Sequence, residues 1–359
     1  MPTEKLISAH RGAPDNPGNR FEKIHLETDE AWNPDDDADG GRPQGLRTQF
    51  FKDHSQTIIT RNDSPDVGFR YSVNPYRGCE HGCIYCYARP THEYLGFSAG
   101  LDFESKIMVK EDAPELLRQE LSSPKWVPQG IFLSGVTDCY QPVERRLKLT
   151  RRCLEVLAEF RNPVFIVTKN QLVTRDIDLL SELAKHQAVT VWLSITTLDP
   201  ELRRIMEPRT SPPAARLAAL RELSAAGIPV GVNVAPIIPG LTDHETPAIL
   251  QAAADAGATS AGYTVVRLPH GVAPLFEKWL EAHFPDRKEK VLNRLKTMHG
   301  GKLYDAQWGK RFSGEGIFAE QIEQLFEAAR RRAGILNEGG ELSTAAFRRP
   351  LGAQLQLFS

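Results

Sequence analysis

From residue 71 onward, short apolar runs alternate with stretches in which apolar residues recur at helical spacing. The expected strands cover residues 71–73, 130–133, 164–168, 189–193, 230–234 and 262–266, and the expected helices cover residues 142–160, 178–183, 213–226, 245–256 and 274–283. Strands that alternate with helices form parallel sheets joined by right-handed crossovers. The pattern therefore predicts an α/β core of six strand–helix units, which is either an open doubly wound sheet or a partial barrel.

The segments on either side of this core have different patterns. Residues 1–70 are polar, acidic and interrupted by prolines, which predicts an irregular arm that is either a flexible leader or a lid over a site. Residues 284–336 contain two amphipathic helical patterns joined by a glycine-rich stretch. We therefore expect four segments, namely the arm, a core over residues 71–283, the C-terminal helices, and a flexible tail over residues 337–359.

Composition narrows the function classes only slightly. Of the 359 residues, 41% are hydrophobic and 25% are charged, which is ordinary for a globular protein, and the net charge of −2 means that any basic surface is local. No apolar run approaches the roughly 18 residues of a membrane span, and the first residues lack the apolar core of a signal peptide. Because the five cysteines are an odd number, we expect reduced thiols and a cytoplasmic protein rather than disulfides.

Three of the five cysteines, Cys79, Cys83 and Cys86, lie within eight residues in the spacing Cys-x3-Cys-x2-Cys. Gly78 and Gly82 allow the backbone between them to fold tightly, so that the three thiolates converge. A closed zinc site takes four ligands, often from two cysteine pairs, and no second pair is present. Three thiolates on a tight loop suit an iron–sulfur cluster with one open iron, and the alternatives are a partial zinc site or unpaired thiols.

Polar residues follow the expected strands, and in a parallel sheet they line one edge. Thr137 and Asp138 follow the second strand and supply oxygen acceptors for an ammonium group, although Asp138 equally suits a helix cap. Lys169 follows the third strand and suits a carboxylate. Ser194 and Thr196 follow the fourth strand, and their hydroxyls suit either a ribose or carboxylate ligand or a helix cap.

The cysteine loop, with the aromatic Tyr85 directly before the last cysteine, resembles the signature of the radical SAM superfamily. This resemblance implies a 4Fe–4S cluster, S-adenosylmethionine bound to the open iron, and a six-unit (β/α) partial barrel. Over residues 71–283 the chain is most similar to the spore photoproduct lyase-like branch. Three features carry that similarity: Tyr85 and Tyr87 around the last cysteine, Thr-Asp after the second strand, and Thr-Lys after the third.

The resemblance also implies which side chains bind the cofactor. Thr137, Lys169 and Ser194 are expected on the methionine portion. Ile238 and Gly240, after the fifth strand, resemble the apolar–glycine motif that flanks the adenine. Tyr85, Asp138 and Thr196 complete the expected cofactor contacts.

The residues expected to act on the substrate are Tyr87, Cys139 and Arg267. The resemblance implies that Tyr87 relays a hydrogen atom, and Arg267 follows the sixth strand near the substrate. In the photoproduct lyase the thiol that donates hydrogen lies three residues before the aspartate, where this chain has Gly135. Either Cys139 replaces that thiol, or Cys139 packs in the core and the substrate differs.

The end of the sequence, Gln354-Leu-Gln-Leu-Phe358, resembles the peptide with which bacterial DNA-repair and replication proteins bind the sliding clamp. In an extended linear motif of this kind, the two last apolar side chains fill a pocket of the partner. The alternative is an apolar tail that docks on its own barrel.

We therefore expect an enzyme of lyase-like chemistry that cleaves S-adenosylmethionine at a 4Fe–4S cluster to form a 5′-deoxyadenosyl radical. The expected substrate is nucleic acid, as in DNA repair, and the expected reductant is a protein such as flavodoxin or ferredoxin. Two alternatives remain open at this point. One is a radical SAM enzyme that modifies RNA or protein, and the other is a non-catalytic iron–sulfur or zinc scaffold bound to the clamp.

Overall fold

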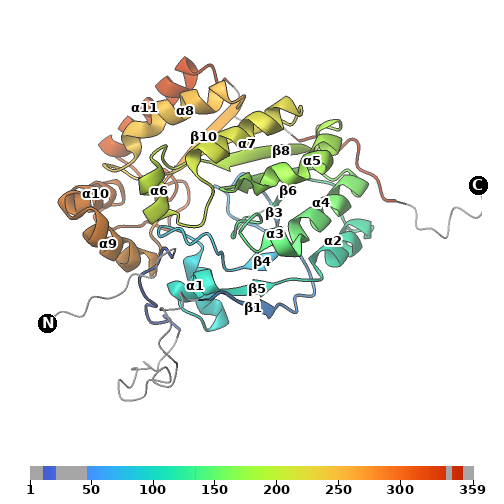
Figure 1. Ribbon diagram of the computed structural model, residues 1–359, viewed down its shortest axis with the longest axis horizontal. Helices are drawn as coiled ribbons and strands as arrows, with labels where there is room; N and C mark the ends of the chain where they lie inside the picture. Colours follow the sequence, from blue (N-terminus) through green and yellow to red (C-terminus); the bar gives the residue numbers. More distant parts are fainter. Residues whose placement is uncertain (1–10, 22–46, 134, 337–341, 351–359) are drawn as a thin grey trace, which may run out of the picture.

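Six parallel strands of the computed structural model form most of one curved sheet, and helices cover its outer face (Figure 1). The structure describes residues 11–21, 47–133, 135–336 and 342–350. The strands of this sheet are β2 (Ile59–Arg61), β3 (Tyr71–Val73), β6 (Ile131–Leu133), β7 (Val164–Thr168), β8 (Val189–Ser194), β9 (Val230–Ile237) and β10 (Ser260–Val265). Their spatial order is β10-β9-β8-β7-β6-β3-β2, and only β2 is antiparallel to its neighbour.

This order confirms the predicted partial barrel. Within the described part of the chain β10 and β2 are the two edges of the sheet, so the barrel is open. All six residues of β8 are buried, as expected for a central parallel strand that is covered on both faces. Phe132, Phe165 and Trp192 lie on the inner face of the curve, where they contact one another in a row.

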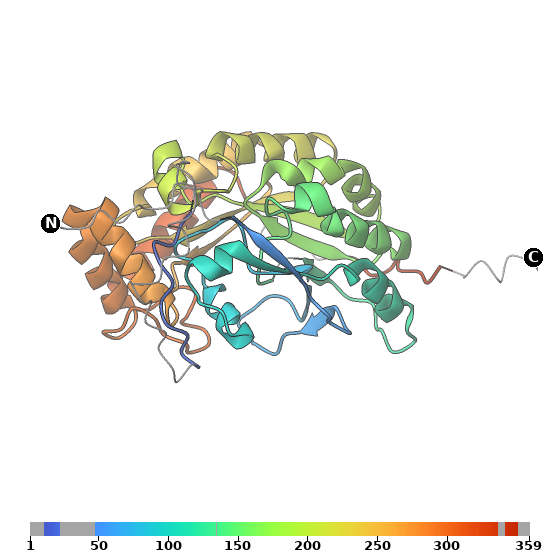
Figure 2. The same cartoon turned by 60° about the horizontal axis from the view of Figure 1, so that its bottom comes forward.

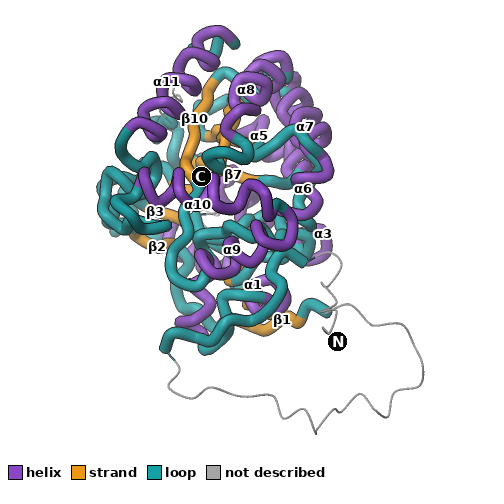
Figure 3. The backbone as a smooth tube through the Cα atoms, turned by 90° about the vertical axis from the view of Figure 1, so that its left-hand side faces the viewer, coloured by secondary structure: helices purple, strands orange, loops and turns teal. Residues whose placement is uncertain are grey.

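The helices follow the strands along the chain. The α-helices are α1 (Leu101–Ser105), α2 (Ala113–Ser122), α3 (Glu144–Leu147), α4 (Leu149–Phe160), α5 (Ile177–Ala184), α6 (Pro200–Met206), α7 (Pro213–Ala225), α8 (Thr246–Asp255), α9 (Val272–His283), α10 (Pro285–Met298) and α11 (Ile317–Arg332). In the described part of the chain, the short 3-10 helices are η1 (Arg89–Leu95), η2 (Gln171–Asp176) and η3 (Asp243–Glu245). Figure 3 shows α11 beside α8, so the C-terminal helix extends the outer layer.

The main core lies between the sheet and this helical layer. Leu154, Leu157, Leu180, Leu220 and Leu250 are fully buried there. Burial of each such side chain contributes roughly 1.5–3 kcal/mol. The apolar stripes of the helices and the apolar strands are therefore what hold the outer layer on the sheet.

The single helix expected over residues 142–160 is divided into α3 and α4. Lys148 between them has a left-handed backbone, with φ of 54°. The buried carboxylate of Glu144 accepts hydrogen bonds from the N–H groups of Thr150 (3.0 Å) and Arg151 (3.4 Å). A carboxylate at this position satisfies otherwise unpaired N–H groups at the start of α4, which explains the break.

The expected irregular arm contains two short strands where the structure describes it. One is β2, and the other is β1 (Gln49–Lys52), which pairs parallel with β5 (Lys106–Val109); β5 in turn pairs antiparallel with β4 (Tyr76–Arg77). All four side chains of β1 are exposed. Short edge strands with exposed side chains carry no apolar periodicity, which is why the pattern did not reveal them. Figure 2 shows this small sheet below the barrel.

The residues that follow α11 return to the amino-terminal ends of the strands. Ser343 N–H donates to the carbonyl of Gln187 (2.9 Å), and Arg348 N–H donates to the carbonyl of Phe160 (2.9 Å). Arg349 donates a side-chain hydrogen bond to the carbonyl of Trp126 (2.7 Å). Within the described residues no helix is long and apolar enough to span a membrane.

A buried carboxylate joins the start of the chain to the cysteine loop. Glu104 of α1 is fully buried and accepts hydrogen bonds from the N–H groups of Gly12 (2.9 Å) and Ala13 (2.7 Å). It also pairs with the buried Arg89 at 2.5 Å, and Arg89 donates to the carbonyl of Cys83 at 3.0 Å. Glu104 therefore connects three segments that are far apart in the sequence.

We predict that Glu104→Ala lowers the free energy of unfolding by about 3–5 kcal/mol, because Arg89 stays buried without its partner. Urea unfolding monitored by circular dichroism measures this. The matched control is Glu201→Ala, which removes an exposed ion pair with Arg204 and is expected to change stability by less than about 1 kcal/mol. Equal effects of the two substitutions would contradict the prediction.

Candidate active site

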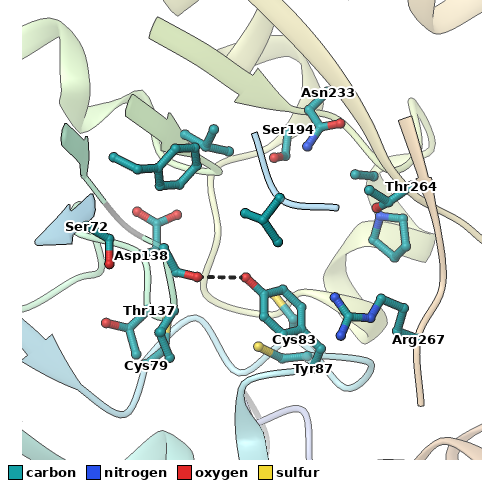
Figure 4. Close-up of a pocket in the computed structure, with 18 of the residues that line it drawn as sticks. Ser72, Cys79, Cys83, Tyr87, Thr137, Asp138, Ser194, Asn233, Thr264 and Arg267 are labelled. Carbon is teal, nitrogen blue, oxygen red and sulfur yellow. Dashed lines mark hydrogen bonds between the residues drawn. The ribbon is translucent and has the colours of Figure 1, made fainter. Parts of the chain in front are cut away.

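A pocket of about 500 Å³ opens at the carboxyl ends of the strands of the main sheet. The cysteine loop supplies one wall, and β6 to β10 supply residues at the ends of their strands (Figure 4). From the cysteine loop the lining residues are Cys79, His81, Cys83, Tyr85, Cys86 and Tyr87. All three cysteines of the motif therefore face the same space.

Two glycines allow the cysteine loop to take this shape. Gly78 has φ of 80° and Gly82 has φ of 67°, a left-handed region that side chains disfavour. A Cβ on Gly78 would lie 2.9 Å from the ring of His92, and a Cβ on Gly82 would lie 2.6 Å from the carboxylate of Glu104. Both the backbone angles and the available space therefore require glycine.

The three thiols fit the iron–sulfur cluster that the family implies. Burial raises the pKa values of Cys79, Cys83 and Cys86, so a metal that binds them must displace their protons. Among the described residues, no group of three or more His, Cys, Asp and Glu side chains is arranged to hold a metal ion. A cluster differs from a single ion because each thiolate binds a separate iron, and three thiolates leave one iron open.

Asp138 lines the pocket, and its carboxylate is fully engaged. It accepts hydrogen bonds from the hydroxyl of Thr168 (2.7 Å) and the N–H of Lys169 (2.8 Å), and it lies 3.3 Å from Nδ1 of His81. Burial raises the pKa of Asp138, but His81 and these hydrogen bonds outweigh burial and lower it to about 2. The ionised Asp138 thus ties the cysteine loop to the end of β7. It also accepts a hydrogen bond from the N–H of Tyr140, as a cap does.

Three more of the expected cofactor residues line the pocket. Lys169 donates from Nζ to the carbonyl of Ala235 (3.1 Å) and lies 5.9 Å from the centre of the Tyr85 ring. Thr137 donates to the carbonyl of Tyr76 (2.9 Å). The buried Ser194 lies at the end of β8 on the same pocket. Lysine and serine thus place one cation and one hydroxyl beside the cysteine loop.

Tyr85 presents its ring to the pocket while its hydroxyl points into a buried network. That hydroxyl donates to Glu207, and Thr196 donates to the same carboxylate at 2.7 Å. Glu207 forms an ion pair with the buried Arg216; burial raises the pKa of Glu207, but Arg216 and Lys169 outweigh it and lower the pKa to about 2. Thr196 belongs to this network and does not line the pocket, and its expected contact with the cofactor stays a prediction. The hydroxyl turns away because Glu207 is its partner.

Ile238 and Gly240 are not among the residues that line the pocket, and their expected contact with the adenine stays a prediction. Strand β9 continues to Ile237, three residues beyond the expected end, and the pocket is lined instead by Asn233, Ala235 and Pro236. Ile238 is buried in the core, and a Cβ on Gly240 would contact side chains of α10 at 3.5 Å.

Cys139 also lies outside the pocket. Its side chain is fully buried in the main core together with Cys153, and its carbonyl accepts a hydrogen bond from the hydroxyl of Thr150 at 2.6 Å. After β6, the carboxylate of Asp138 contacts the end of β7, whereas the carbonyl of Cys139 contacts α4. This burial favours the alternative of a packed core thiol, and the expected role of Cys139 as a hydrogen donor stays a prediction.

The two other residues expected on the substrate do line the pocket. Tyr87 donates from its hydroxyl to the carbonyl of Gly135 at 3.0 Å. The guanidinium of Arg267 lies over the Tyr87 ring at 5.0 Å from its centre (Figure 4). These two side chains therefore form one unit at the pocket, from the cysteine loop and from the residues after β10.

Part of the pocket wall comes from segments that the sequence pattern did not place there. From residues before β3 the lining residues are Thr60, Arg61, Asn62, Val67 and Phe69, and from the connection between α10 and α11 they are Arg311 and Phe312. Asp66 joins these segments, because it pairs with Arg311 at 2.5 Å and accepts from the N–H of Gly309 at 3.1 Å. The arm is thus part of the wall in this region, and no local pattern signals a contact over such a sequence distance.

Comparisons with known proteins agree with this architecture. A model of the radical SAM superfamily matches residues 73–253. An uncharacterized protein of Mycobacterium tuberculosis is 41% identical over 220 residues, which cover 61% of this chain and 65% of that protein, just under two thirds of its length. An uncharacterized protein of Methanocaldococcus jannaschii is 34% identical over 184 residues, which cover 51% of this chain and 66% of that protein.

A structural comparison concerns the fold alone. A spore photoproduct lyase complexed with dinucleoside spore photoproduct is similar with a TM-score of 0.57 and 17% sequence identity, over 80% of this chain and 79% of that one. The family match begins at β3, includes the cysteine loop and extends through β9 into α8. It therefore spans the segment that forms most of the barrel and the thiol wall of its pocket, and this chain belongs to the radical SAM superfamily of enzymes.

Proposed function

We propose that this protein is a radical SAM enzyme that acts on nucleic acid. The observation that carries the proposal is that three thiols of one tight loop face a pocket that also holds Lys169, arginines and aromatic rings. When bound, the reduced cluster supplies the electron that cleaves S-adenosylmethionine to methionine and a 5′-deoxyadenosyl radical. The chain's own residues hold the cofactor, orient it and exclude water.

The residues that would hold the cofactor come from separate strand ends. Cys79, Cys83 and Cys86 would bind the cluster, and Lys169 and Ser194 would bind the carboxylate of the methionine portion. Asp138 keeps the loop and β7 together, because its oxygens already accept hydrogen bonds from both. Asn233, Ala235 and Pro236 of β9 line the pocket and are proposed for the nucleoside portion, together with Ile238 and Gly240 directly after them.

The proposal of a nucleic acid substrate has two supports. The net charge of the chain is −2, yet Arg61, Arg267, Arg311 and Lys169 all line this pocket, so its basic character is local. Aromatic rings also line it, with Phe69 stacked on Phe132 at 4.1 Å between ring centres. Cations bind phosphates and rings stack on bases. We further propose that a flavodoxin or ferredoxin donates the electron.

A second partner is proposed for the end of the chain. The motif from Gln354 to Phe358 lies outside the described residues, and we propose that it binds a bacterial sliding clamp. Residues 342–350, which precede it, are hydrogen-bonded at the amino-terminal ends of the strands, opposite to the pocket. A clamp bound there would raise the local concentration of enzyme at DNA without covering the pocket.

We predict that each of Cys79→Ala, Cys83→Ala and Cys86→Ala loses the cluster, because each removes one of three ligands that face the pocket. Anaerobically reconstituted wild type should contain about four irons and four sulfides per chain. The matched control is Cys153→Ala, which removes a thiol of the core and should keep the full iron and sulfide content. A cluster retained in the triple alanine variant would contradict the assignment.

The test of the function is anaerobic incubation of the reduced enzyme with S-adenosylmethionine and with single-stranded DNA, duplex DNA or RNA. We expect 5′-deoxyadenosine and an altered nucleoside, both detected by mass spectrometry. Lys169→Ala should weaken the affinity for S-adenosylmethionine by on the order of 1.5–3 kcal/mol, since a carboxylate loses its cation.

The exposed Lys185→Ala serves as the control for that variant and should leave the affinity unchanged. An unchanged affinity in Lys169→Ala would remove this lysine from the site. Formation of 5′-deoxyadenosine without any altered nucleoside, together with a modified protein substrate, would replace nucleic acid by protein in the proposal.

We predict that deletion of residues 354–358 abolishes binding to purified sliding clamp, measured by surface plasmon resonance, and leaves cofactor cleavage unchanged. Leu357→Ala with Phe358→Ala should act similarly, because two buried apolar side chains contribute about 1.5–3 kcal/mol each. Gln356→Ala, at the variable position of the motif, is the control and should bind normally. Equal binding by the full-length and truncated proteins would defeat the proposal.

A further inference from the structure

The arginines of the pocket differ in how their charges are balanced. Arg61 pairs with Asp63 at 2.8 Å, and Arg311 pairs with Asp66 at 2.5 Å. Arg267 has no carboxylate within ion-pair distance in the part of the chain that the structure describes. Its only polar contact there is at 3.5 Å, to the hydroxyl of Tyr304. Arg267 is therefore the pocket arginine whose charge is not offset by a neighbouring acid.

Aromatic rings hold the guanidinium of Arg267 in place. Its central carbon lies 4.6 Å from the centre of the Phe312 ring, 5.0 Å from that of Tyr87 and 5.8 Å from that of Tyr304. Contact with the faces of rings leaves the N–H groups at the edge of the guanidinium as donors for a ligand. The Nε atom is buried and has no hydrogen-bond partner among the described residues.

This aromatic cage is itself anchored by hydrogen bonds. The hydroxyl of Tyr87 donates to the carbonyl of Gly135 at 3.0 Å, and the N–H of Val265 donates to the carbonyl of Phe312 at 2.7 Å. Two rings of the cage are thereby fixed to the residues after β6 and to β10. A cation that is held in this way loses little conformational entropy when it binds a ligand.

A stacking surface lies on the same pocket. Phe69 and Phe132 both line it, with their rings nearly parallel at an interplanar angle of 19°. Phe132 continues the stack onto Phe165 at 4.9 Å, and all three side chains are half-buried, which leaves part of their surface open. Bases stack on such rings with little dependence on sequence. The pocket thus combines an aromatic surface with one unbalanced, caged cation.

We propose that Arg267 binds a backbone phosphate of a nucleic acid strand whose base stacks on Phe69. This proposal rests on the proposed function, because it takes nucleic acid as the substrate. It adds which parts of the strand the pocket recognises, namely a backbone phosphate and a base. The guanidinium has the planar fork of donors that matches phosphate oxygens. A peptide carboxylate would satisfy the same fork but would not use the ring stack, so the structure favours the nucleotide.

The experiment measures binding rather than turnover. The probes are fluorescein-labelled thymidine tetranucleotides, one with phosphodiester linkages and one with uncharged methylphosphonate linkages. Their dissociation constants for the reconstituted enzyme with S-adenosylmethionine are measured anaerobically by fluorescence anisotropy over a range of salt concentrations. The variants are Arg267→Gln, Arg267→Lys and, as a control with the same change in charge outside the pocket, Arg204→Gln, whose exposed side chain pairs with Glu201.

We expect the wild type to bind the phosphodiester probe about tenfold more tightly than the methylphosphonate probe, and Arg267→Gln to lose most of this preference. The slope of log affinity against log salt should fall by about 0.7 in Arg267→Gln, the value for one phosphate contact on a single strand. Arg204→Gln should keep both the preference and the slope, and Arg267→Lys should restore part of the preference. Iron content equal to that of the wild type shows that the variants are folded.

Three results would overturn the proposal: no binding of either probe by the wild type, equal binding of both probes, or an unchanged preference in Arg267→Gln. Tighter binding of a carboxylate-ended peptide than of either probe would assign Arg267 to a peptide substrate instead. The two proposals fail separately. A phosphate preference that depends on Arg267, without any altered nucleoside, would leave this site standing and reject the reaction. Altered nucleosides without that preference would support the reaction and reject the phosphate site at Arg267.

Discussion

The fixed shape of the cysteine loop depends on the buried ion pair between Arg89 and Glu104. Arg89 donates to the carbonyl of Cys83, and Glu104 lies so close to Gly82 that a side chain there would clash with it. A buried ion pair is stable only when its remaining donors and acceptors are satisfied, and here the N–H groups of the segment 11–21 supply two of the bonds to Glu104. The loop is therefore held by these polar contacts in addition to the apolar core, in which Ile84 is fully buried.

Two further buried carboxylates hold the same loop from other sides. Asp138, after β6, contacts His81 of the loop and the start of the turn after β7. Glu207, after α6, accepts from Tyr85 of the loop and pairs with Arg216 of α7. Both carboxylates have pKa values of about 2 and remain charged at neutral pH. Charged, fully bonded groups specify one geometry, which a site for a cluster and a cofactor needs.

The barrel and the added segments have different tasks around the pocket. The strand ends carry Lys169, Ser194 and Asn233 beside the cysteine loop, where a cofactor would bind. The residues before β3 and those between α10 and α11 close the other side, and the Asp66–Arg311 pair joins them. The barrel thus supplies the proposed cofactor side of the pocket, and segments outside the strand–helix repeat supply the opposite side.

The sequence by itself determined the six parallel strands, their order along the chain and the cysteine loop. Strands that are buried on both faces must be apolar, and ligand spacing within eight residues is a local property. It also placed Thr137, Asp138, Lys169 and Ser194 at the pocket, since strand ends of a parallel sheet meet at one edge. Each of these features depends on a short stretch of chain, so a pattern in the local sequence can predict it.

Only the tertiary structure decided which neighbouring residues reach the pocket and which distant segments complete it. Cys139, Thr196, Ile238 and Gly240 do not line the pocket, because the direction of a turn, the hydrogen-bond partner of Thr196 and the length of β9 depend on packing. Phe69, Arg311 and Phe312 arrive from segments about 240 residues apart, as the pair between Asp66 and Arg311 shows. Contacts over such distances leave no periodic pattern, because nothing in the local sequence depends on the partner.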